Sequence, residues 1–190
     1  MNNLIRDLRD SAAELKNLRS VTGAGLLLAL SVLLTYFFRL DFGGSLSVGL
    51  AFTATALMGM IYGPVVTGLA AGLGDILKWF LKPQGPYFFG YTFNVMVAGM
   101  LYGLFLYGKK PTLLRSAAAK TSVNLLVNAI MNTFWMAVLG GKGFYAMIPV
   151  RIVKNLTLLP VEIAILYVVL NAAWKALLRA GYLKRRAPVR

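Results

Sequence analysis

The sequence predicts an all-α membrane protein with six transmembrane helices, both termini in the cytoplasm and a short amphipathic helix at the N-terminus. Three observations predict it. Of the 190 residues, 58% are hydrophobic and only 14% are charged, whereas about 25% of a soluble domain is charged. The apolar residues form segments long enough for a bilayer core, which needs about 20 residues per helix. Basic residues cluster between these segments, as they do beside transmembrane helices.

Six segments have the required length and composition: 21–38, 47–62, 64–81, 89–107, 114–139 and 147–174. Only Tyr62-Gly63-Pro64 separates the second from the third, and we expect a tight turn there because proline suits the first position of a new helix. Residues 1–19 space their leucines along one helical face and predict a cytoplasmic amphipathic helix, on the inner membrane surface or docked on the bundle. Residues 20–178 then form the membrane domain, and 179–190 a basic cytoplasmic tail.

The distribution of basic residues predicts the orientation. With the N-terminus inside, 14 of the 20 lysines and arginines fall on the cytoplasmic side, as the positive-inside rule requires. These are Arg6, Arg9, Lys16, Arg19, Lys109, Lys110, Arg115, Lys120, Lys175, Arg179, Lys184, Arg185, Arg186 and Arg190. The other six lie at or near the outer helix ends: Arg39, Lys78, Lys82, Lys142, Arg151 and Lys154.

Composition also excludes several classes of activity. The chain has no cysteine and no histidine, which excludes disulfides, thiolate nucleophiles, Cys/His metal sites and histidine acid–base chemistry. Its basic residues do not form the single stripe of a nucleic-acid binder. No G-x-x-x-x-G-K-[ST] motif is present, so any ATP hydrolysis must occur in other chains. We expect no catalytic residue, no metal and no cofactor.

Small residues recur four positions apart on the predicted helices. The steps are Gly25–Ala29, Gly59–Gly63, Gly68–Gly72 and Gly99–Gly103. Such steps let helix backbones approach closely in lipid. Packing within the bundle explains all four, and the alternative is that at least one faces a separate membrane partner.

Polar residues gather in the predicted outer half of the bundle, where charges at membrane depth usually mark a pathway or a site. Asp75 lies about two turns below the end of the third helix, with Lys78 one turn above it, and the two could simply neutralise each other. The fifth helix carries a stripe of asparagines ending near Trp135. These asparagines either form hydrogen bonds between helices or line a ligand-binding site. One outward-facing cavity for a polar, anionic, partly aromatic molecule explains this asymmetry best, and loop 39–48 is its candidate lid. The stripe consists of Asn124, Asn128 and Asn132.

Residues 62–107, "YGPVVTGLAAGLGDILKWFLKPQGPYFFGYTFNVMVAGMLYGLFLY", carry a resemblance to a known family. The YGP turn, the glycine-rich helix ending in D-x-L, the Pro/Gly/aromatic loop and the closing YG-x-FLY resemble the substrate-binding S components of energy-coupling-factor (ECF) vitamin transporters, the folate family most of all. The resemblance implies a membrane coupling subunit and two cytoplasmic ATPases as partners. It also implies contact with the coupling subunit through the small-residue step of the first helix, here Gly25 and Ala29.

For folate, the resemblance suggests a role for each polar group. Asp75 is expected to accept two hydrogen bonds from the pterin ring, and Asn128, Asn132 and Asn155 to satisfy its other edges. The glutamate tail is expected to lie outermost, with the ammonium groups of Lys78 and Lys82 close to its negative charge. The residues expected to stack on the ring are Trp79, Phe88, Tyr91 and Trp135. The arginines expected near the tail are Arg39 and Arg151.

Three other interpretations remain open. Pantothenate or another anionic vitamin suits the basic outer residues equally well but makes poor use of the aromatic residues. A membrane enzyme such as a lipid phosphotransferase usually needs clustered carboxylates with a metal, or histidine. A structural scaffold predicts no saturable ligand and leaves the outer polar cluster unexplained.

Overall fold

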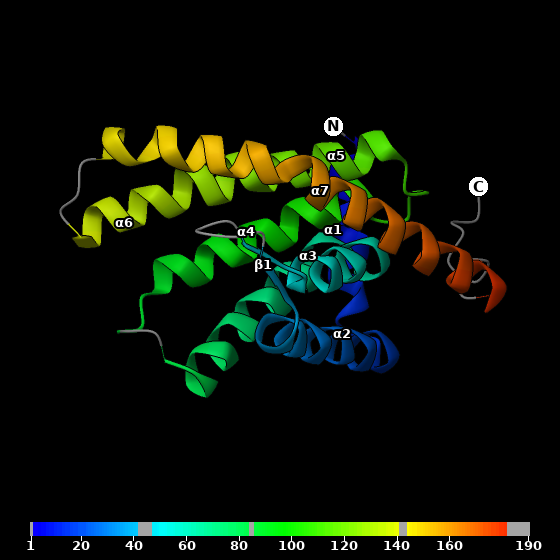
Figure 1. The fold of residues 1–190 in the computed structure, drawn as a ribbon. Helices are drawn as coiled ribbons and strands as arrows, with labels where there is room; N and C mark the ends of the chain where they lie inside the picture. The colour runs from blue at the N-terminus through cyan, green and yellow to red at the C-terminus, as the bar shows by residue number, and fades with distance from the viewer. Residues whose placement is uncertain (1, 42–46, 84–85, 141–143, 182–190) are drawn as a thin grey trace.

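The computed structural model describes residues 2–41, 47–83, 86–140 and 144–181. It is a bundle of helices with one small hairpin of strands (Figure 1). In chain order the elements are α1 (Asn2–Glu14), α2 (Leu18–Phe37), β1 (Arg39–Asp41), β2 (Ser47–Gly49), α3 (Ala51–Leu81), α4 (Phe89–Leu106), α5 (Leu113–Ser122), the π-helix η1 (Val123–Met131), α6 (Asn132–Gly140) and α7 (Phe144–Arg179).

Within the described residues, five helical stretches are long and apolar enough to cross a membrane. They are Leu18–Phe37, Ala51–Leu81, Phe89–Leu106, Leu113–Leu139 and Asn155–Arg179. The predicted all-helical membrane class is therefore confirmed. The structure adds a short antiparallel hairpin that sequence did not predict: β1 pairs with β2, Leu40 opposite Val48. Residues 42–46, half of the predicted lid, lie outside the described residues.

The predicted turn between the second and third segments lies inside α3, at Gly63. This residue has φ 83° and ψ −177°, a left-handed conformation that favours glycine. Pro64 follows at the first position of the new helical segment, where its missing N–H is no loss. The two segments on either side lie next to each other, because Met58 from one and Ala70 from the other belong to one buried cluster.

A serine from α1 secures this turn. The Ser11 hydroxyl donates to the Tyr62 carbonyl at 2.8 Å and accepts from the Val65 and Val66 amides at 3.0 and 3.3 Å. It thus satisfies the free amides of a helix start in the way an N-cap does, but from another helix. The helix predicted within residues 1–19 is therefore docked on the bundle, at the turn that joins the two segments of α3.

Glycines allow α3 and α4 to pack with their backbones almost touching. A Cβ added at Gly103 would lie 2.3 Å from Cα of Pro64, and one added at Gly99 would lie 2.8 Å from the Thr67 carbonyl oxygen. These steps therefore serve packing within the bundle, as the sequence suggested. Gly25 differs, since a Cβ there would meet no atom within 4 Å.

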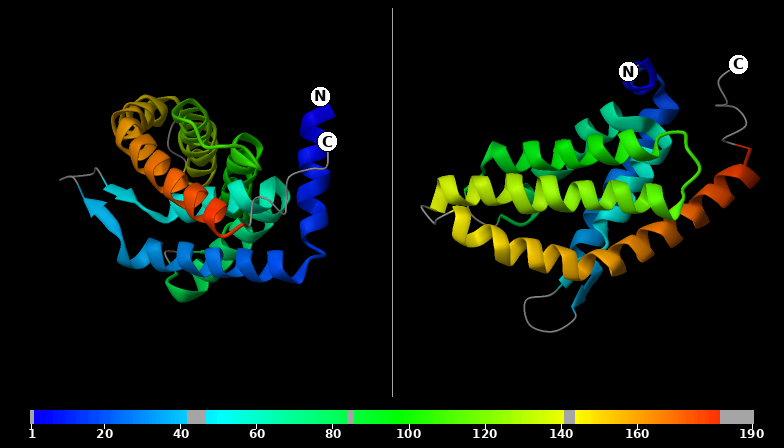
Figure 2. Two further views of the ribbon diagram at one scale, coloured as in Figure 1. Left: turned by 90° about the vertical axis from the view of Figure 1, so that its right-hand side faces the viewer. Right: turned by 90° about the horizontal axis from the view of Figure 1, so that it is seen from above.

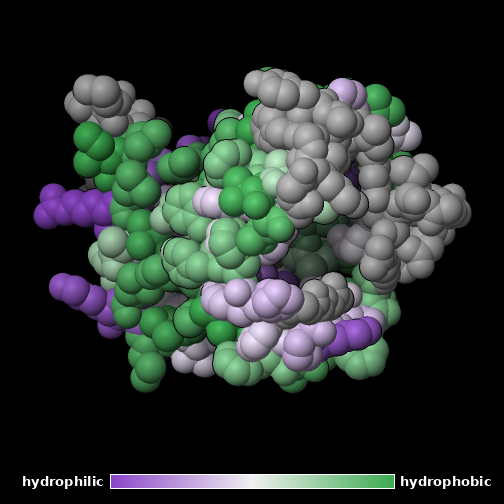
Figure 3. Space-filling view, turned by 90° about the vertical axis from the view of Figure 1, so that its left-hand side faces the viewer, coloured by the Kyte–Doolittle hydropathy of each residue, from purple (hydrophilic) through white to green (hydrophobic). Residues whose placement is uncertain are grey.

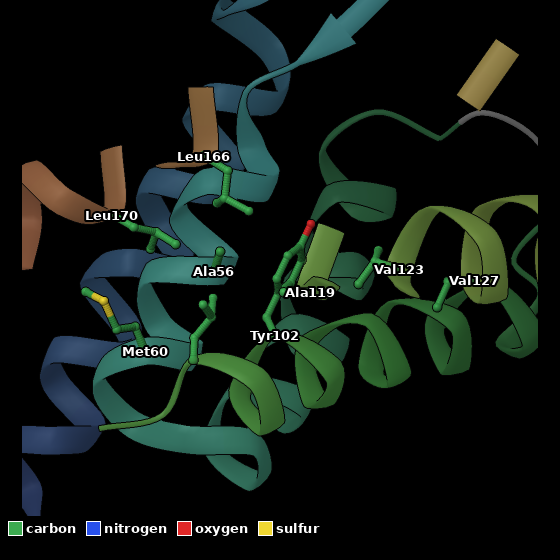
Figure 4. Packing of buried hydrophobic residues seen from close by; sticks show 9 residues of the cluster. Ala56, Met60, Tyr102, Ala119, Val123, Val127, Leu166 and Leu170 are labelled. Atoms are coloured by element: carbon green, nitrogen blue, oxygen red, sulfur yellow. The ribbon is translucent and has the colours of Figure 1, made fainter. Parts of the chain in front are cut away.

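The main core joins α3, α4, α5, η1 and α7 around Tyr102, which is only 2% exposed (Figure 4). Met60 and Leu170 pack into the same cluster from α3 and α7. Figure 2 shows α1 and the last turns of α7 toward the same end of the bundle. The β1–β2 hairpin and the start of α4 lie away from this end (Figure 2), and Ala51 and Phe52, just after β2, and Tyr91, at the start of α4, line the candidate site.

Replacing Gly103 by alanine is expected to destabilise the bundle by about 2 kcal/mol, because the added methyl group overpacks the contact with Pro64. The measurement is thermal unfolding in detergent. Gly25→Ala is the matched control, since it adds the same methyl group in open space and should leave the melting temperature unchanged or slightly raised. Equal melting temperatures for the two variants would contradict the close contact.

Candidate ligand-binding site

A cavity of about 270 Å³ lies between α3, α4 and the continuous stretch α5–η1–α6. Figure 3 looks at the end of the bundle where α4 begins and shows a shaded recess among polar and apolar side chains. Residues from both ends of α3 contribute to the wall, because the turn at Gly63 folds that helix back on itself. The lining residues are Ser31, Ala51, Phe52, Thr55, Lys78, Tyr91, Asn94, Val95, Ala98, Tyr102, Lys120, Val123, Val127, Asn128 and Asn132.

Four of the residues predicted from sequence lie together on this wall: Lys78, Tyr91, Asn128 and Asn132. The asparagine stripe does divide, however. Asn128 and Asn132 face the cavity, whereas Asn124 is 1% exposed and lies behind them, bonded to Glu162. All of η1 is a π-helix, a rare form that is frequently found at functional sites.

Two buried polar groups on the wall find no hydrogen-bond partner among the described residues: the Asn94 side-chain nitrogen and the Tyr102 hydroxyl. Buried polar groups are nearly always paired, so such exceptions need an explanation. Figure 4 shows the Tyr102 ring running between the helices with its oxygen at the far tip. Sequence reasoning missed both residues, although an asparagine inside an apolar helix was a signal that could have revealed Asn94.

Trp135 fixes the orientation of Asn94. Its indole nitrogen donates to Asn94 Oδ1 at 3.0 Å, which turns the amide nitrogen of Asn94 away from the indole. Phe88 packs edge-on against both Trp135 and Tyr91, with ring centroids 5.2 and 5.8 Å apart. The predicted aromatic residues Phe88, Tyr91 and Trp135 thus form one group at the start of α4. Gly90 makes room for it, since a Cβ there would lie 2.8 Å from the Trp135 ring.

Lys120, which the sequence analysis counted among the cytoplasmic residues, is buried inside the bundle. It is 3% exposed, lines the cavity and pairs with Glu162 of α7 at 3.2 Å. Its ammonium group also lies 3.8 Å from the centroid of the Phe52 ring, a cation–π contact. The positive-inside count included it because it lies within two turns of the start of the predicted fifth helix.

Asp75 lies outside the cavity wall. Its Oδ2 accepts a hydrogen bond from Thr92 at 2.8 Å, and the Tyr87 hydroxyl lies 2.7 Å from the same threonine oxygen. Trp79 packs on the Tyr87 ring with centroids 5.5 Å apart. Asp75 and Trp79 therefore tie the end of α3 to the start of α4, and their direct contact with a ligand stays a prediction.

Lys78 connects the site to α2. Its ammonium nitrogen lies 3.4 Å from Ser31 Oγ, and its carbonyl accepts from the Tyr36 hydroxyl at 2.7 Å.

The remaining predicted residues are placed as follows. Lys82 is exposed just after α3, and Asn155 is half-buried in α7. The side chains of Arg39 and Arg151 fall outside the described ones, so their predicted roles are untested.

The Lys120–Glu162 pair is expected to stabilise the bundle only as a pair. Lys120→Met leaves a buried carboxylate without its cation and should destabilise the protein by about 3 kcal/mol. Adding Glu162→Gln should recover much of that loss, as measured by thermal unfolding in detergent. Lys110→Met is the control because Lys110 is exposed. A single variant that melts like wild type would show that the two charges are not coupled.

Comparisons with known proteins agree with this architecture. Residues 19–170 match the family described as ECF transporter, substrate-specific component. The folate transporter FolT of Clostridium novyi (strain NT) is 34% identical over 128 residues, which cover 67% of this chain and 72% of that protein. A FolT from Leuconostoc mesenteroides is 30% identical, over 77% and 81% of the two chains.

One solved structure, a crystal structure of FolT bound with folic acid, superposes with a TM-score of 0.70 and is 30% identical. The match covers 81% of this chain and 92% of that one. The resemblance that residues 62–107 indicated is thereby confirmed over most of the sequence. The chain belongs to the family of substrate-specific components of ECF transporters and is a multi-pass membrane protein.

Proposed function

We propose that this protein binds folate in the cavity between α3, α4 and η1 and delivers it through an ECF-type importer. The proposal is carried by two polar groups on the cavity wall that have no hydrogen-bond partner in the described part of the chain, Asn94 Nδ2 and the Tyr102 hydroxyl. A ligand ring rich in hydrogen-bonding atoms can satisfy both, whereas a ligand without hydrogen-bonding atoms satisfies neither. That the relatives are folate transporters, one of them solved with folic acid bound, supports the same ligand.

The shape and charge of the cavity support one way for folate to lie. At about 270 Å³ the cavity is near the lower limit for small-molecule sites, so the pterin ring enters it and the rest of folate extends toward the open end. Tyr91 offers an aromatic face to the ring. Lys78 lies on the wall near the end of α3, in position to meet the negative charge of the glutamate tail, with Lys82, Arg39 and Arg151 farther out.

The orientation in the membrane is part of the proposal. Ala51–Tyr62 and Pro64–Leu81 cross separately, which gives six crossings and places both termini in the cytoplasm, where the remaining basic helix ends gather. The cavity then opens to the outside. Release on the inside requires a membrane coupling subunit and two ATPases, because this chain has no nucleotide-binding motif.

The outward face of α2 supports a contact with the coupling subunit. Gly25 and Ala29 are exposed, and a side chain at Gly25 would meet nothing in this protein. Small residues four apart allow another helix to approach this face closely. We therefore expect α2 to carry the partner contact at Gly25 and Ala29 while its buried residue Ser31 contacts Lys78 of the site.

Folic acid is expected to bind the purified chain at a ratio of one to one and to quench its three tryptophans. Asn94→Ala and Tyr102→Phe should each weaken binding by about tenfold, since each removes one hydrogen bond from a buried site. Titration of tryptophan fluorescence measures both, with pantothenate as the comparison ligand. Binding of pantothenate alone would keep the family but refute the pterin site, and saturation by neither ligand would refute the proposal.

Bulky residues on α2 are expected to separate binding from transport. Gly25→Leu combined with Ala29→Leu should leave folic acid affinity unchanged but prevent co-purification with the coupling subunit and abolish uptake. Ala164→Leu, an exposed change on α7, is the matched control and should leave both unaffected. If the α2 variant still co-purifies with its partner, the contact lies elsewhere.

A further inference from the structure

A chain of hydrogen bonds runs from Glu162 on α7 to Asn128 on the cavity wall. Asn124 Nδ2 donates to Glu162 Oε2 at 2.6 Å, and Asn128 Nδ2 donates to Asn124 Oδ1 at 3.0 Å. Lys120 holds the other carboxylate oxygen of Glu162 at 3.2 Å. Of the two asparagines, only Asn128 lines the cavity. Glu162 therefore reaches the site through the buried amide of Asn124 and the half-buried amide of Asn128.

Each step in this chain allows only one orientation of the amides. The Glu162 carboxylate beside Lys120 accepts hydrogen bonds and cannot donate them, so Asn124 must turn its nitrogen toward it. The oxygen of Asn124 then faces Asn128. Because this oxygen only accepts hydrogen bonds, Asn128 must donate to it from its own amide nitrogen. The oxygen of Asn128 remains as the group available to a ligand, and it is a hydrogen-bond acceptor.

Asn94 is oriented in the opposite sense. The Trp135 indole is a donor only, and it bonds to the oxygen of Asn94 at 3.0 Å. The amide nitrogen of Asn94, which has no partner among the described residues, is left as a donor. The same cavity therefore presents a fixed donor at Asn94 and a fixed acceptor at Asn128.

We infer that Glu162 is a positioning residue that sets ligand specificity by fixing the acceptor at Asn128 through Asn124. This inference rests on the proposed folate function and deepens it. A donor and an acceptor of fixed position select a ring with a lactam edge, in which a carbonyl neighbours an N–H, as in the pterin of folic acid. In a ring with an amine in place of the carbonyl, the amine is a donor and the neighbouring ring nitrogen is an acceptor. The donor of the ring then faces the donor of Asn94, and its acceptor faces the acceptor of Asn128. Buried hydrogen-bonding groups reject such analogues because they are left unpaired.

The test compares folic acid with 4-amino-4-deoxyfolic acid, which differs only at that edge and keeps the glutamate tail. Affinities of the full-length chain in detergent are measured by tryptophan quenching. Wild type is expected to prefer folic acid, and Asn124→Ala to reduce that preference by about tenfold because Asn128 becomes free to turn. Asn124 lies behind the wall and leaves the Lys120–Glu162 pair intact when it is replaced.

Two further variants make the result specific. Glu162→Gln keeps the size of the side chain but can donate a hydrogen bond, so it should reduce the preference for folic acid as Asn124→Ala does. The inference can therefore still be tested if one of these two variants fails to fold. Asn171→Ala is the matched control on α7, since Asn171 bonds only to the Tyr167 carbonyl of its own helix among the bonds described. It should leave the preference unchanged.

A purely structural role for the chain of hydrogen bonds predicts that both ligands weaken by the same factor. That result, or a wild type without preference, overturns the inference while the folate function stands. Failure of wild type to bind folic acid at all overturns the proposed function, and this inference with it.

Discussion

The need to satisfy buried polar groups inside an apolar bundle is the constraint on which this structure depends. Little water is available there, so each donor or acceptor must find a protein partner. The Ser11 hydroxyl meets this need at the Gly63 turn, and Glu162 meets it for Lys120. Once these groups are paired, Asn94 and Tyr102 stand out on the cavity wall. The same constraint that holds the bundle together therefore identifies its site.

Much of the fold could be predicted because apolar length and turn residues are local signals. The helices, the turn at Gly63 and the close packing at Gly99 and Gly103 all followed from neighbours in sequence. Pairing between distant residues leaves no such signal. Lys120 looked like a cytoplasmic charge because its partner Glu162 belongs to another helix, and only the packing of α5 against α7 brings them together.

Of the predicted site residues whose side chains the structure describes, Lys78, Tyr91, Asn128 and Asn132 line one cavity, and the others do not, for the same reason. The asparagines of the fifth helix share a face, so a polar wall followed from spacing alone. Which of them line the cavity depends on the π-helical backbone and on Glu162, neither of which spacing reveals. Asp75 was the most conspicuous charge in the sequence, yet Thr92 takes up one of its oxygens. Asp75 therefore joins two helices, whereas the uncharged residue Asn94 lines the cavity.

A crystal structure of this chain with folic acid would test the central claim most directly. We expect the pterin ring to lie between Tyr91 and the α5–η1–α6 wall, within hydrogen-bond distance of Asn94 Nδ2, Asn128 Oδ1 and the Tyr102 hydroxyl. A ring bound against Asp75 and Trp79, with Asn94 and Tyr102 still unpaired, would contradict it.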